Sequence, residues 1–262
     1  MAEILTPRPA ATVLALRDGP DGFEVLMLRR NLNSDFVGGA YVFPGGAVDV
    51  GDAGAIQDLV VGPHDHEVSQ RLGIESGGLA YYVACLRELF EEAGLLIACD
   101  REGRAVVSDD ATVVRMAAHR RAVNDGSMNF LEVMQREGLW LDLRGLAYLA
   151  HWVTPVGPPR RYDTRFFVAL APHGQLAAHD DGETIADLWL RPSDALAAHR
   201  SGQFEMIFPT IRTLEKVAHF ATSREVLDYA NSLDEITRVE PRIVMRGAQP
   251  VILAPGDEGY DV

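Results

Sequence analysis

Three glutamates and an arginine stand close together in a segment that is otherwise apolar. Arg87, Glu88, Glu91 and Glu92 lie within GGLAYYVACLRELFEEAGLLIAC, residues 77–99. At about 100° per residue on a helix, the glutamates share one face, and Leu, Val, Tyr and Phe side chains take the opposite face. No lysine lies four residues away to neutralise any of them. The cluster is therefore either the solvated face of a surface helix or a set of oxygen ligands for a hard cation such as Mg²⁺ or Mn²⁺.

A pair of glycines precedes this segment. Gly45 and Gly46 follow Pro44 in GGAYVFPGGAV, which indicates a short strand leading into a turn. Because glycine has no Cβ, either residue can let the backbone approach a neighbouring site closely. An ordinary type II or I′ turn is the other interpretation, and the two are compatible.

The two segments together resemble a known motif. From Arg87 to Leu95, RELFEEAGL matches the second half of the Nudix box, Arg-Glu-U-x-Glu-Glu-x-Gly-U with U an aliphatic residue, at every fixed position. FPGG resembles the turn that opens the same box. The chain resembles Nudix hydrolases most strongly over residues 13–95, and more weakly to about residue 232. The resemblance implies an α/β fold, the Nudix-type α/β/α sandwich with a mixed sheet, here with helical insertions.

The resemblance also implies roles for the charged residues. The box glutamates of the family bind a divalent metal, which implies that Glu88, Glu91 and Glu92 bind Mg²⁺ or Mn²⁺, with Glu91 also counted as catalytic. The arginine of the box orients a glutamate, which implies that role for Arg87 as a catalytic residue. The glycine pair would then lie against the substrate. The implied reaction is pyrophosphohydrolysis, in which water attacks one phosphorus of a diphosphate and the other phosphate leaves.

The chain departs from the box in one respect. In the family pattern five residues separate the glycine from a first glutamate, and seven more precede the arginine. Here Asp52 takes the place of that glutamate, and residues 53–86 follow it, about 27 more than the pattern has. The role of Asp52 is therefore open. An insertion at this point resembles the peroxisomal coenzyme A diphosphatase branch of the family, as do the segments HWVTP, RRYDTRFF and FPTIRTL.

The branch resemblance extends to the substrate. Arg30 precedes FPGG at the distance found in the branch, and we expect it to bind substrate, although Asn31 and Asp35 stand where the broader signature has Ser or Ala and a second arginine. The resemblance implies a diphosphate-linked nucleotide, with coenzyme A or acyl-CoA as the leading substrate. NAD(H), FAD or another dinucleotide is the alternative. A non-catalytic Nudix-fold nucleotide-binding sensor is the alternative of a different class, and the intact acidic cluster favours the enzyme.

An acidic loop distant from the box offers a general base. HDDGETIADLWL contains Asp180, Asp181 and Glu183 just before a predicted strand. We favour Glu183 as a catalytic residue because its place before the strand resembles an acidic position of the family. An ordinary acidic turn built on Asp-Gly is the alternative interpretation.

Other polar and aromatic residues have two interpretations each. Asp163 and Arg165 alternate along a predicted strand and share a face, so that Arg165 either binds the phosphates of the ligand or pairs with Asp163. His64 and His66 form H-x-H without a third nitrogen or sulfur ligand nearby, which is more typical of surface histidines than of a zinc site. The tryptophans fit the core or an interface, unless one stacks on an adenine. They are Trp140, Trp152 and Trp189.

Composition excludes several classes of protein. The 262 residues include 24 basic and 38 acidic ones, a net charge of −14, which excludes extended contact with a nucleic-acid polymer but not a small phosphorylated ligand held by a metal. Cys85 and Cys99 lie in apolar segments without CxxC spacing, as is typical of a reduced cytoplasmic protein. Neither a signal peptide nor a membrane-spanning stretch is indicated. We expect a soluble cytoplasmic protein without a membrane partner, and a homodimer is compatible with these features.

Strands and helices interleave, so we expect a single Nudix hydrolase domain over residues 1–262. A hairpin turning at residues 18–22 opens it, and the glutamates lie on a helix over residues 79–93 that Gly94 ends. The expected additions are an insert at about 53–78 within the box, a helical insert at about 110–138, and C-terminal helices and a tail at about 193–262. Because both ends of the first insert are fixed beside the box, we expect its apolar patches to form a cap over the mouth of the site.

Overall fold

The computed structural model describes residues 5–32, 38–53, 57–106, 108–180, 182–247 and 249–260. Asp35 and Asp181, both named from the sequence, lie outside these ranges. Within the ranges, no helix has the length and apolar character needed to cross a membrane.

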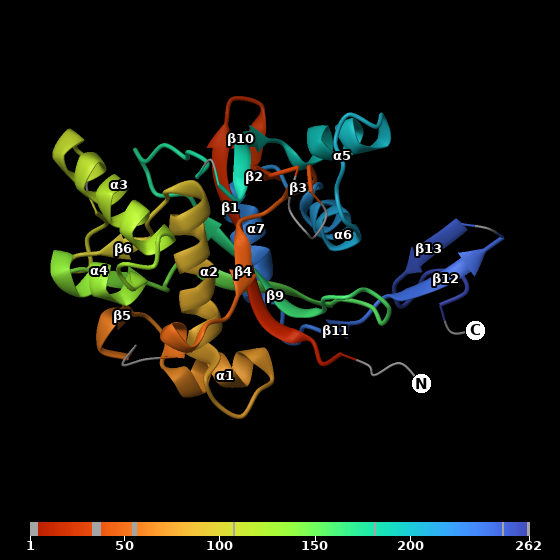
Figure 1. Cartoon of the computed structure of the whole chain (residues 1–262), viewed down its shortest axis with the longest axis horizontal. Helices are drawn as coiled ribbons and strands as arrows, with labels where there is room; N and C mark the ends of the chain where they lie inside the picture. Colours follow the sequence, from red (N-terminus) through yellow and green to blue (C-terminus); the bar gives the residue numbers. More distant parts are fainter. Residues whose placement is uncertain are drawn as a thin grey trace.

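A mixed eight-stranded sheet forms the centre of the molecule (Figure 1). Six strands lie in the order β10-β2-β1-β9-β8-β11, while β3 pairs with β2 and β4 pairs with β1. Strand β1 runs parallel to β9 and antiparallel to β2 and β4. The strands are β1 (Arg8–Gly19), β2 (Gly22–Arg30), β3 (Tyr41–Val42), β4 (Gly45–Ala47), β8 (Leu146–Val153), β9 (Tyr162–Leu170), β10 (Thr184–Leu190) and β11 (Arg238–Val239).

Helices cover both faces of this sheet, and the predicted α/β/α sandwich is confirmed. In β1, Val13 and Ala15 pack toward α1, α2 and α4, whereas Leu14 and Leu16 pack toward α5, α6 and α7. This alternation follows from the extended backbone, which turns successive side chains to opposite faces. The helices are α1 (Asp65–Leu72), α2 (Gly78–Ala93), α3 (Asp110–Asn124), α4 (Phe130–Glu137), α5 (Pro192–Arg200), α6 (Phe208–Val217) and α7 (Ser223–Ser232).

Two short sheets lie outside the main one. A three-stranded sheet, β5 (Val60–Val61), β7 (Trp140–Asp142) and β6 (Ala98–Cys99), joins the first insert to the segment around α4. A hairpin of β12 (Arg242–Arg246) and β13 (Gln249–Leu253) projects near the C-terminus, away from the sandwich (Figure 1). The sequence did not indicate this hairpin.

The glycine segment is a strand rather than the predicted turn. Gly45 and Gly46 belong to β4 and pair antiparallel with Thr12 and Ala11 of β1. A side chain at either position has no room, because a Cβ on Gly45 would lie 2.6 Å from the Ala11 carbonyl oxygen. Close approach of backbones, and not a turn, is therefore what these glycines allow.

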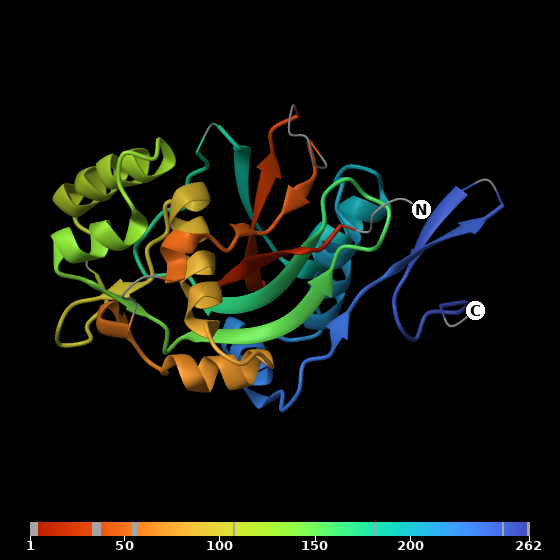
Figure 2. The ribbon, with the colours of Figure 1, turned by 60° about the horizontal axis from the view of Figure 1, so that its bottom comes forward.

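The first insert packs against the beginning of α2 (Figure 2). Helix α2 starts after Gly77 and has no side-chain cap of its own. Asp65 of α1 accepts hydrogen bonds from the backbone N–H groups of Gly77 (3.0 Å) and Leu79 (2.9 Å), and the Ser69 hydroxyl accepts one from Gly78 (2.9 Å). The insert thus satisfies N–H groups that a helix start leaves without partners.

Among the described residues of the insert, helix α1 lies at the beginning of α2 and not over the site, where the cap was expected. The insert does pack, since Val68 and Leu72 of α1 are part of the core. At 1.5 Å per residue, however, Leu79 lies about 18 Å along α2 from Glu91. Helix α1 therefore supports one end of α2 and leaves the glutamates at the other end uncovered by it.

Candidate active site

The glutamates lie in the second half of α2, which is buried on nearly all sides. The helix ends at Gly94, whose φ of 70° is left-handed and whose N–H donates to the Phe90 carbonyl. Arg87 and Glu92 are only 8% and 4% exposed. The polar face is therefore not a solvated surface, because it packs against β4 and the 3₁₀ turn η1 (Val50–Ala53).

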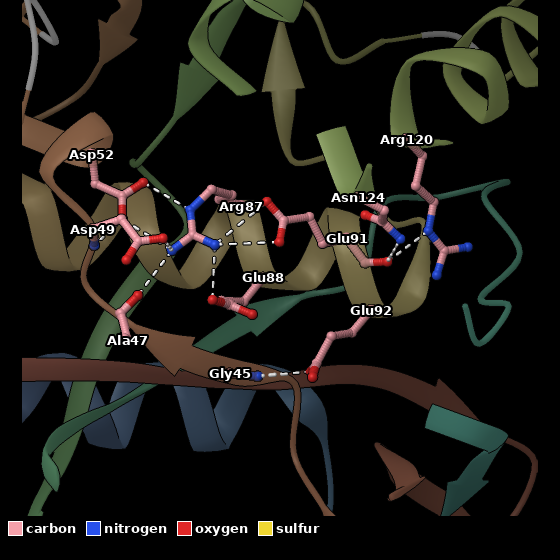
Figure 3. Close-up of polar contacts among 10 residues, drawn as sticks. All are labelled: Gly45, Ala47, Asp49, Asp52, Arg87, Glu88, Glu91, Glu92, Arg120 and Asn124. Carbon is pink, nitrogen blue, oxygen red and sulfur yellow. Dashed lines mark hydrogen bonds and ion pairs between the residues drawn. The ribbon is translucent and has the colours of Figure 1, made fainter. Parts of the chain in front are cut away.

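Arg87 lies at the centre of the charged cluster (Figure 3). Its Nε and Nη2 donate to the two carboxylate oxygens of Asp52 at 2.8 and 3.0 Å. Its Nη1 donates to Glu88 at 2.8 Å and to Glu91 at 3.3 Å, and Nη2 also donates to the Ala47 carbonyl at 2.9 Å. The guanidinium thus contacts two glutamates of its own helix, and the catalytic, orienting role implied for Arg87 stays a prediction.

The structure gives Asp52 a defined place. Its side chain lies in η1 and is buried, with both oxygens on Arg87, and its Oδ2 also accepts from the Asp49 N–H at 2.8 Å. The Asp49 carboxylate itself lies 3.7 Å from Arg87. Asp52 and Arg87, which the insertion separates along the chain, therefore lie side by side, and both oxygens of this aspartate hold the arginine.

The glycine strand β4 lies directly against the glutamates. The Gly45 N–H donates to Glu92 at 3.0 Å. A Cβ on Gly46 would lie only 2.3 Å from Glu88 Oε1, closer than any side chain allows. Strand β4 can therefore approach α2 only because both residues are glycine, which agrees with the close approach predicted for them.

Burial raises the pKa of the glutamates. The pKa of Glu88 is raised to about 7 by burial and by the charges of Glu91 and Glu183, although Arg87 acts in the opposite sense. Burial and the charge of Glu88 raise the pKa of Glu92 well above its usual range, and burial raises that of Glu91. One arginine thus faces more carboxylates than it neutralises, and the site has an excess of negative charge.

This donor set fits a hard divalent ion. Mg²⁺ and Mn²⁺ prefer carboxylate oxygens, and such an ion would stabilise the ionised carboxylates against the burial and the repulsion that raise the three pKa values. Among the described residues, no three His, Cys, Asp or Glu side chains converge into a preformed metal cage. Glu88 and Glu91 form ion pairs with Arg87, and Glu92 accepts a hydrogen bond from the Gly45 N–H. Side-chain rotation is therefore needed before Glu88, Glu91 and Glu92 can share an ion.

The structure brings two more predicted residues to this end of α2. Arg30 ends β2, and its charge acts on Glu92 by lowering a pKa that burial raises. The backbone carbonyl of Glu183 accepts a hydrogen bond from the Asn31 N–H at 2.8 Å, and the Glu183 side chain is exposed. Its charge raises the pKa of Glu88 and of Glu92. Arg30 and Glu183 therefore border the acidic cluster.

Asp180 has a structural position in the same loop. Its carboxylate accepts hydrogen bonds from the Thr184 N–H, the Thr184 hydroxyl and the Glu183 N–H. These bonds hold its pKa below the usual range although burial acts the other way. Asp180 thus closes the turn that presents Glu183, which leaves Glu183 as the better candidate for a base.

Arg165 is not brought to the glutamates. It is buried, pairs with Asp163, and stacks on the ring of Tyr81 at 4.5 Å, two helical turns before Glu88. Asp163 also lies 2.6 Å from His151 Nε2. Pairing with Asp163 is thus the observed alternative, and a substrate-binding role for Arg165 stays a prediction.

The remaining sequence candidates have structural positions. His64 lies just before α1, with its ring stacked near that of His66 and no metal cage among the described residues. The tryptophans are partly buried, at an interface between elements: Trp140 donates to the Asp58 carbonyl, Trp152 donates to Thr213, and Trp189 lies under Arg17.

Sequence reasoning missed two residues that contact the acidic helix. Arg120 and Asn124 of α3 donate to the Glu91 carbonyl at 2.8 and 3.3 Å (Figure 3). Both lie on a helix that was predicted, but nothing in the local pattern indicates which neighbour that helix contacts.

Known structures define the class of this fold and site. The crystal structure of a NUDIX hydrolase from Alicyclobacillus acidocaldarius is 28% identical and superposes with a TM-score of 0.69, covering 85% of this chain and 96% of that chain. The chain has the same sandwich, and its helix α2, which contains the Nudix-box residues, packs against the glycine strand β4. The chain is therefore a Nudix hydrolase.

Curated relatives and a family model narrow the class. Acyl-coenzyme A diphosphatase NUDT19 of Gallus gallus is 29% identical over 282 residues, covering 92% of this chain and 74% of the relative. The Homo sapiens protein of the same name is 25% identical, covering 97% of this chain and 76% of the relative. The NUDT19 Nudix domain model matches residues 64–217. The chain belongs to the NUDT19 Nudix domain family.

Proposed function

We propose that this chain hydrolyses the diphosphate of coenzyme A or an acyl-CoA, with Mg²⁺ or Mn²⁺ held by Glu88, Glu91 and Glu92. The observation that carries the proposal is the buried excess of carboxylates on α2 beside β4. The substrate is supported by relatives that are named acyl-coenzyme A diphosphatases. Hydrolysis adds water to one phosphorus and breaks the anhydride P–O bond, which gives two phosphate monoesters.

Some residues of the chain position the metal ligands, and others supply charge. A bound divalent ion would neutralise the diphosphate and make its water more acidic. Arg87 holds Glu88 and Glu91, and the Gly45 N–H holds Glu92, on one face of α2, from which rotation of the side chains would bring them to a shared ion. Arg30, whose charge acts on Glu92, would bind a phosphate oxygen of the substrate.

Glu183 is our candidate for the general base. Its carboxylate is exposed and lies near the cluster, at a turn that Asp180 closes. A base on a loop can accept the proton of the attacking water without being a metal ligand. Asp181, outside the described residues, is the alternative from the sequence.

The test is a substrate panel with the purified protein. Coenzyme A, acetyl-CoA, NADH, FAD and ADP-ribose are each incubated with Mg²⁺ or Mn²⁺, and the products are identified by mass spectrometry. We expect the highest kcat/KM for coenzyme A or acetyl-CoA, with phosphopantetheine or its acyl form as one product. A preference for NADH or FAD would replace the substrate, and no turnover on the whole panel would leave a nucleotide-binding sensor as the function.

Two broader expectations are also proposals. A homodimer would have a surface available on the β12–β13 hairpin, where Ile243, Met245 and Ile252 are exposed. Size-exclusion chromatography with light scattering checks this, and a mass of one chain at all concentrations would contradict it. The cytoplasmic location predicted from the two buried thiols is checked by cell fractionation.

A further inference from the structure

Helix α3 belongs to the helical insert and has an unusual surface. None of its fifteen residues, all of which the structure describes, is buried. Only partly buried apolar side chains such as Met116 and Val123 pack against the core. Arg115 and His119 of α3 bind Glu137 of α4. Little apolar burial holds α3 to the body, so its polar contacts with α2 become the more important.

Those polar contacts converge on one atom of α2. The Glu91 carbonyl oxygen accepts from Arg120 Nε at 2.8 Å and from Asn124 Nδ2 at 3.3 Å (Figure 3). A Cβ on Gly94 would lie 3.1 Å from Arg120 Nη1, so the guanidinium crosses the end of the helix. Arg120 therefore lies over the turn that carries Glu91 and Glu92.

The end of a helix leaves carbonyl groups without partners in the helix. At the end of α2 the Phe90 carbonyl accepts a hydrogen bond from the Gly94 N–H, and the Ala93 carbonyl accepts one from the Ala178 N–H at 3.0 Å. The Glu91 carbonyl depends on α3. A cationic donor is also favourable there, because the helix dipole is negative at its C-terminus.

We infer that Arg120 is a positioning residue of the active site. It fixes the backbone between Glu91 and Glu92, and this sets where their carboxylates lie relative to Glu88 one turn earlier. The inference rests on the proposed function, in which those carboxylates bind the metal. Outer-shell partners of this kind commonly change metal affinity or activity by about 10- to 100-fold when removed.

The chain contains two matched controls. Arg121→Met changes the adjacent, exposed residue of the same helix. Asp65→Asn removes an acceptor at the opposite end of α2, about 18 Å from Glu91 along the helix. Arg121→Met removes a positive charge from α3, and Asp65→Asn weakens the hydrogen bonds at the beginning of α2. Neither of these two described residues contacts the turn that carries Glu91 and Glu92.

The first measurement does not depend on metal or substrate. Hydrogen–deuterium exchange is followed by mass spectrometry for peptides covering residues 86–97 in the full-length protein. We expect Arg120→Met to speed exchange in this segment and Arg121→Met to leave it unchanged. Asp65→Asn should speed exchange at the start of α2 instead. Unchanged exchange at residues 86–97 in Arg120→Met would overturn the inference even if the protein proves to be an active diphosphatase.

The second measurement follows the metal and the reaction. Mn²⁺ affinity is measured by calorimetry, and kcat and KM are measured at saturating Mn²⁺. We expect Arg120→Met to weaken Mn²⁺ binding and lower kcat by about tenfold each, with KM for the nucleotide changed less than about twofold. Arg120→Lys keeps a cationic donor and should restore most of both losses.

Equal losses in Arg120→Met and Arg120→Lys, or equal losses in Arg121→Met, would mean that α3 supports only the fold, and the inference would be wrong. A wild-type protein that neither binds Mn²⁺ nor hydrolyses any nucleotide would contradict the proposed function instead. The exchange measurement would then still report whether Arg120 holds the end of α2.

Discussion

Two charged clusters contact α2, and they differ in their balance of charge. Near the end of the helix, Arg87 lies within 4 Å of the carboxylates of Asp49, Asp52, Glu88 and Glu91. Near its beginning, the carboxylate of Asp163 lies beside His151, Arg165 and Arg238. The first cluster has too few cations for its acids, and the second has enough.

The pKa values follow this difference. Burial raises the pKa of Glu88, Glu91 and Glu92, because Arg87 cannot satisfy them all. Burial acts on Asp163 as well, but the hydrogen bond from His151 and the charge of Arg165 lower its pKa below the usual range. We propose that the buried acidic excess binds a cation and that the balanced cluster has a structural role.

The largest effect is expected from removing one charge of the acidic cluster. Glu92→Gln keeps an oxygen that can accept from the Gly45 N–H, so the fold should be retained. We expect kcat to fall at least about 100-fold, on the scale of losing one electrostatic stabiliser. Steady-state kinetics and circular dichroism check this, and near-normal turnover would remove Glu92 from the site.

The metal-free Glu92→Gln protein should also be at least as heat-stable as the wild type. The substitution replaces a buried carboxyl, whose raised pKa shows that its ionisation is costly in the folded protein, by an amide that cannot ionise. A clear loss of stability would mean that the cluster is structural, like the one around Asp163.

The exposed acid of the loop should behave differently from the buried ones. We expect Glu183→Gln to lower kcat by about 100-fold or less, to flatten the acidic limb of the pH–rate profile, and to leave Mn²⁺ affinity nearly unchanged. A profile that keeps its acidic limb would exclude Glu183 as the base and point to Asp180, Asp181 or a metal-bound hydroxide that needs no separate base.

The balanced cluster should respond in stability rather than in chemistry. Asp163→Asn leaves Arg165 without its charged partner, which we expect to cost about 2 kcal/mol, below the fully buried case because Asp163 is 23% exposed. Chemical denaturation checks the loss, and kcat per folded molecule should change little. A large drop in kcat with unchanged stability would return Arg165 to the substrate site.

A smaller effect is expected from pH. Glu88 keeps its proton to about pH 7 in the folded protein and loses it near its ordinary value of 4.5 when unfolded. Between these values the folded state binds more protons, so the stability of the metal-free protein should fall as pH rises. We expect this fall in thermal melts between pH 5 and pH 7.5, and a smaller one with saturating Mg²⁺. The same slope in Glu88→Gln would assign it to other groups.

The sequence predicted what local pattern determines. The helix over residues 79–93, its end at Gly94 and the opening hairpin follow from periodicity and glycine positions, and all three are observed. The contact of Asp52 with Arg87 could not be predicted, because it depends on the path of the insertion between them. The contact of Arg120 with Glu91 could not be predicted without knowing how α3 packs on α2. None of the α3 residues is buried, so its sequence has no apolar face that would indicate the side toward α2.

Two errors have the same physical origin. The glycine segment was predicted as a turn because Pro-Gly-Gly favours turns, but pairing with β1 extends it into β4. The insert was expected over the glutamates because its ends are anchored beside them, but its helix α1 packs in the core through Val68 and Leu72 and contacts the beginning of α2 through Asp65. In both cases a distant partner decided the outcome.

The most direct test of the uncompensated acidic cluster is the number of protons released when metal binds. Calorimetric titration of Mn²⁺ at pH 6.5 in two buffers of different ionisation enthalpy gives this number. Because the pKa values of Glu88 and Glu92 are raised, metal binding should displace about one proton or more, and Glu92→Gln should bind more weakly and release fewer. Binding with no proton release, or equal binding by Glu92→Gln, would contradict the account.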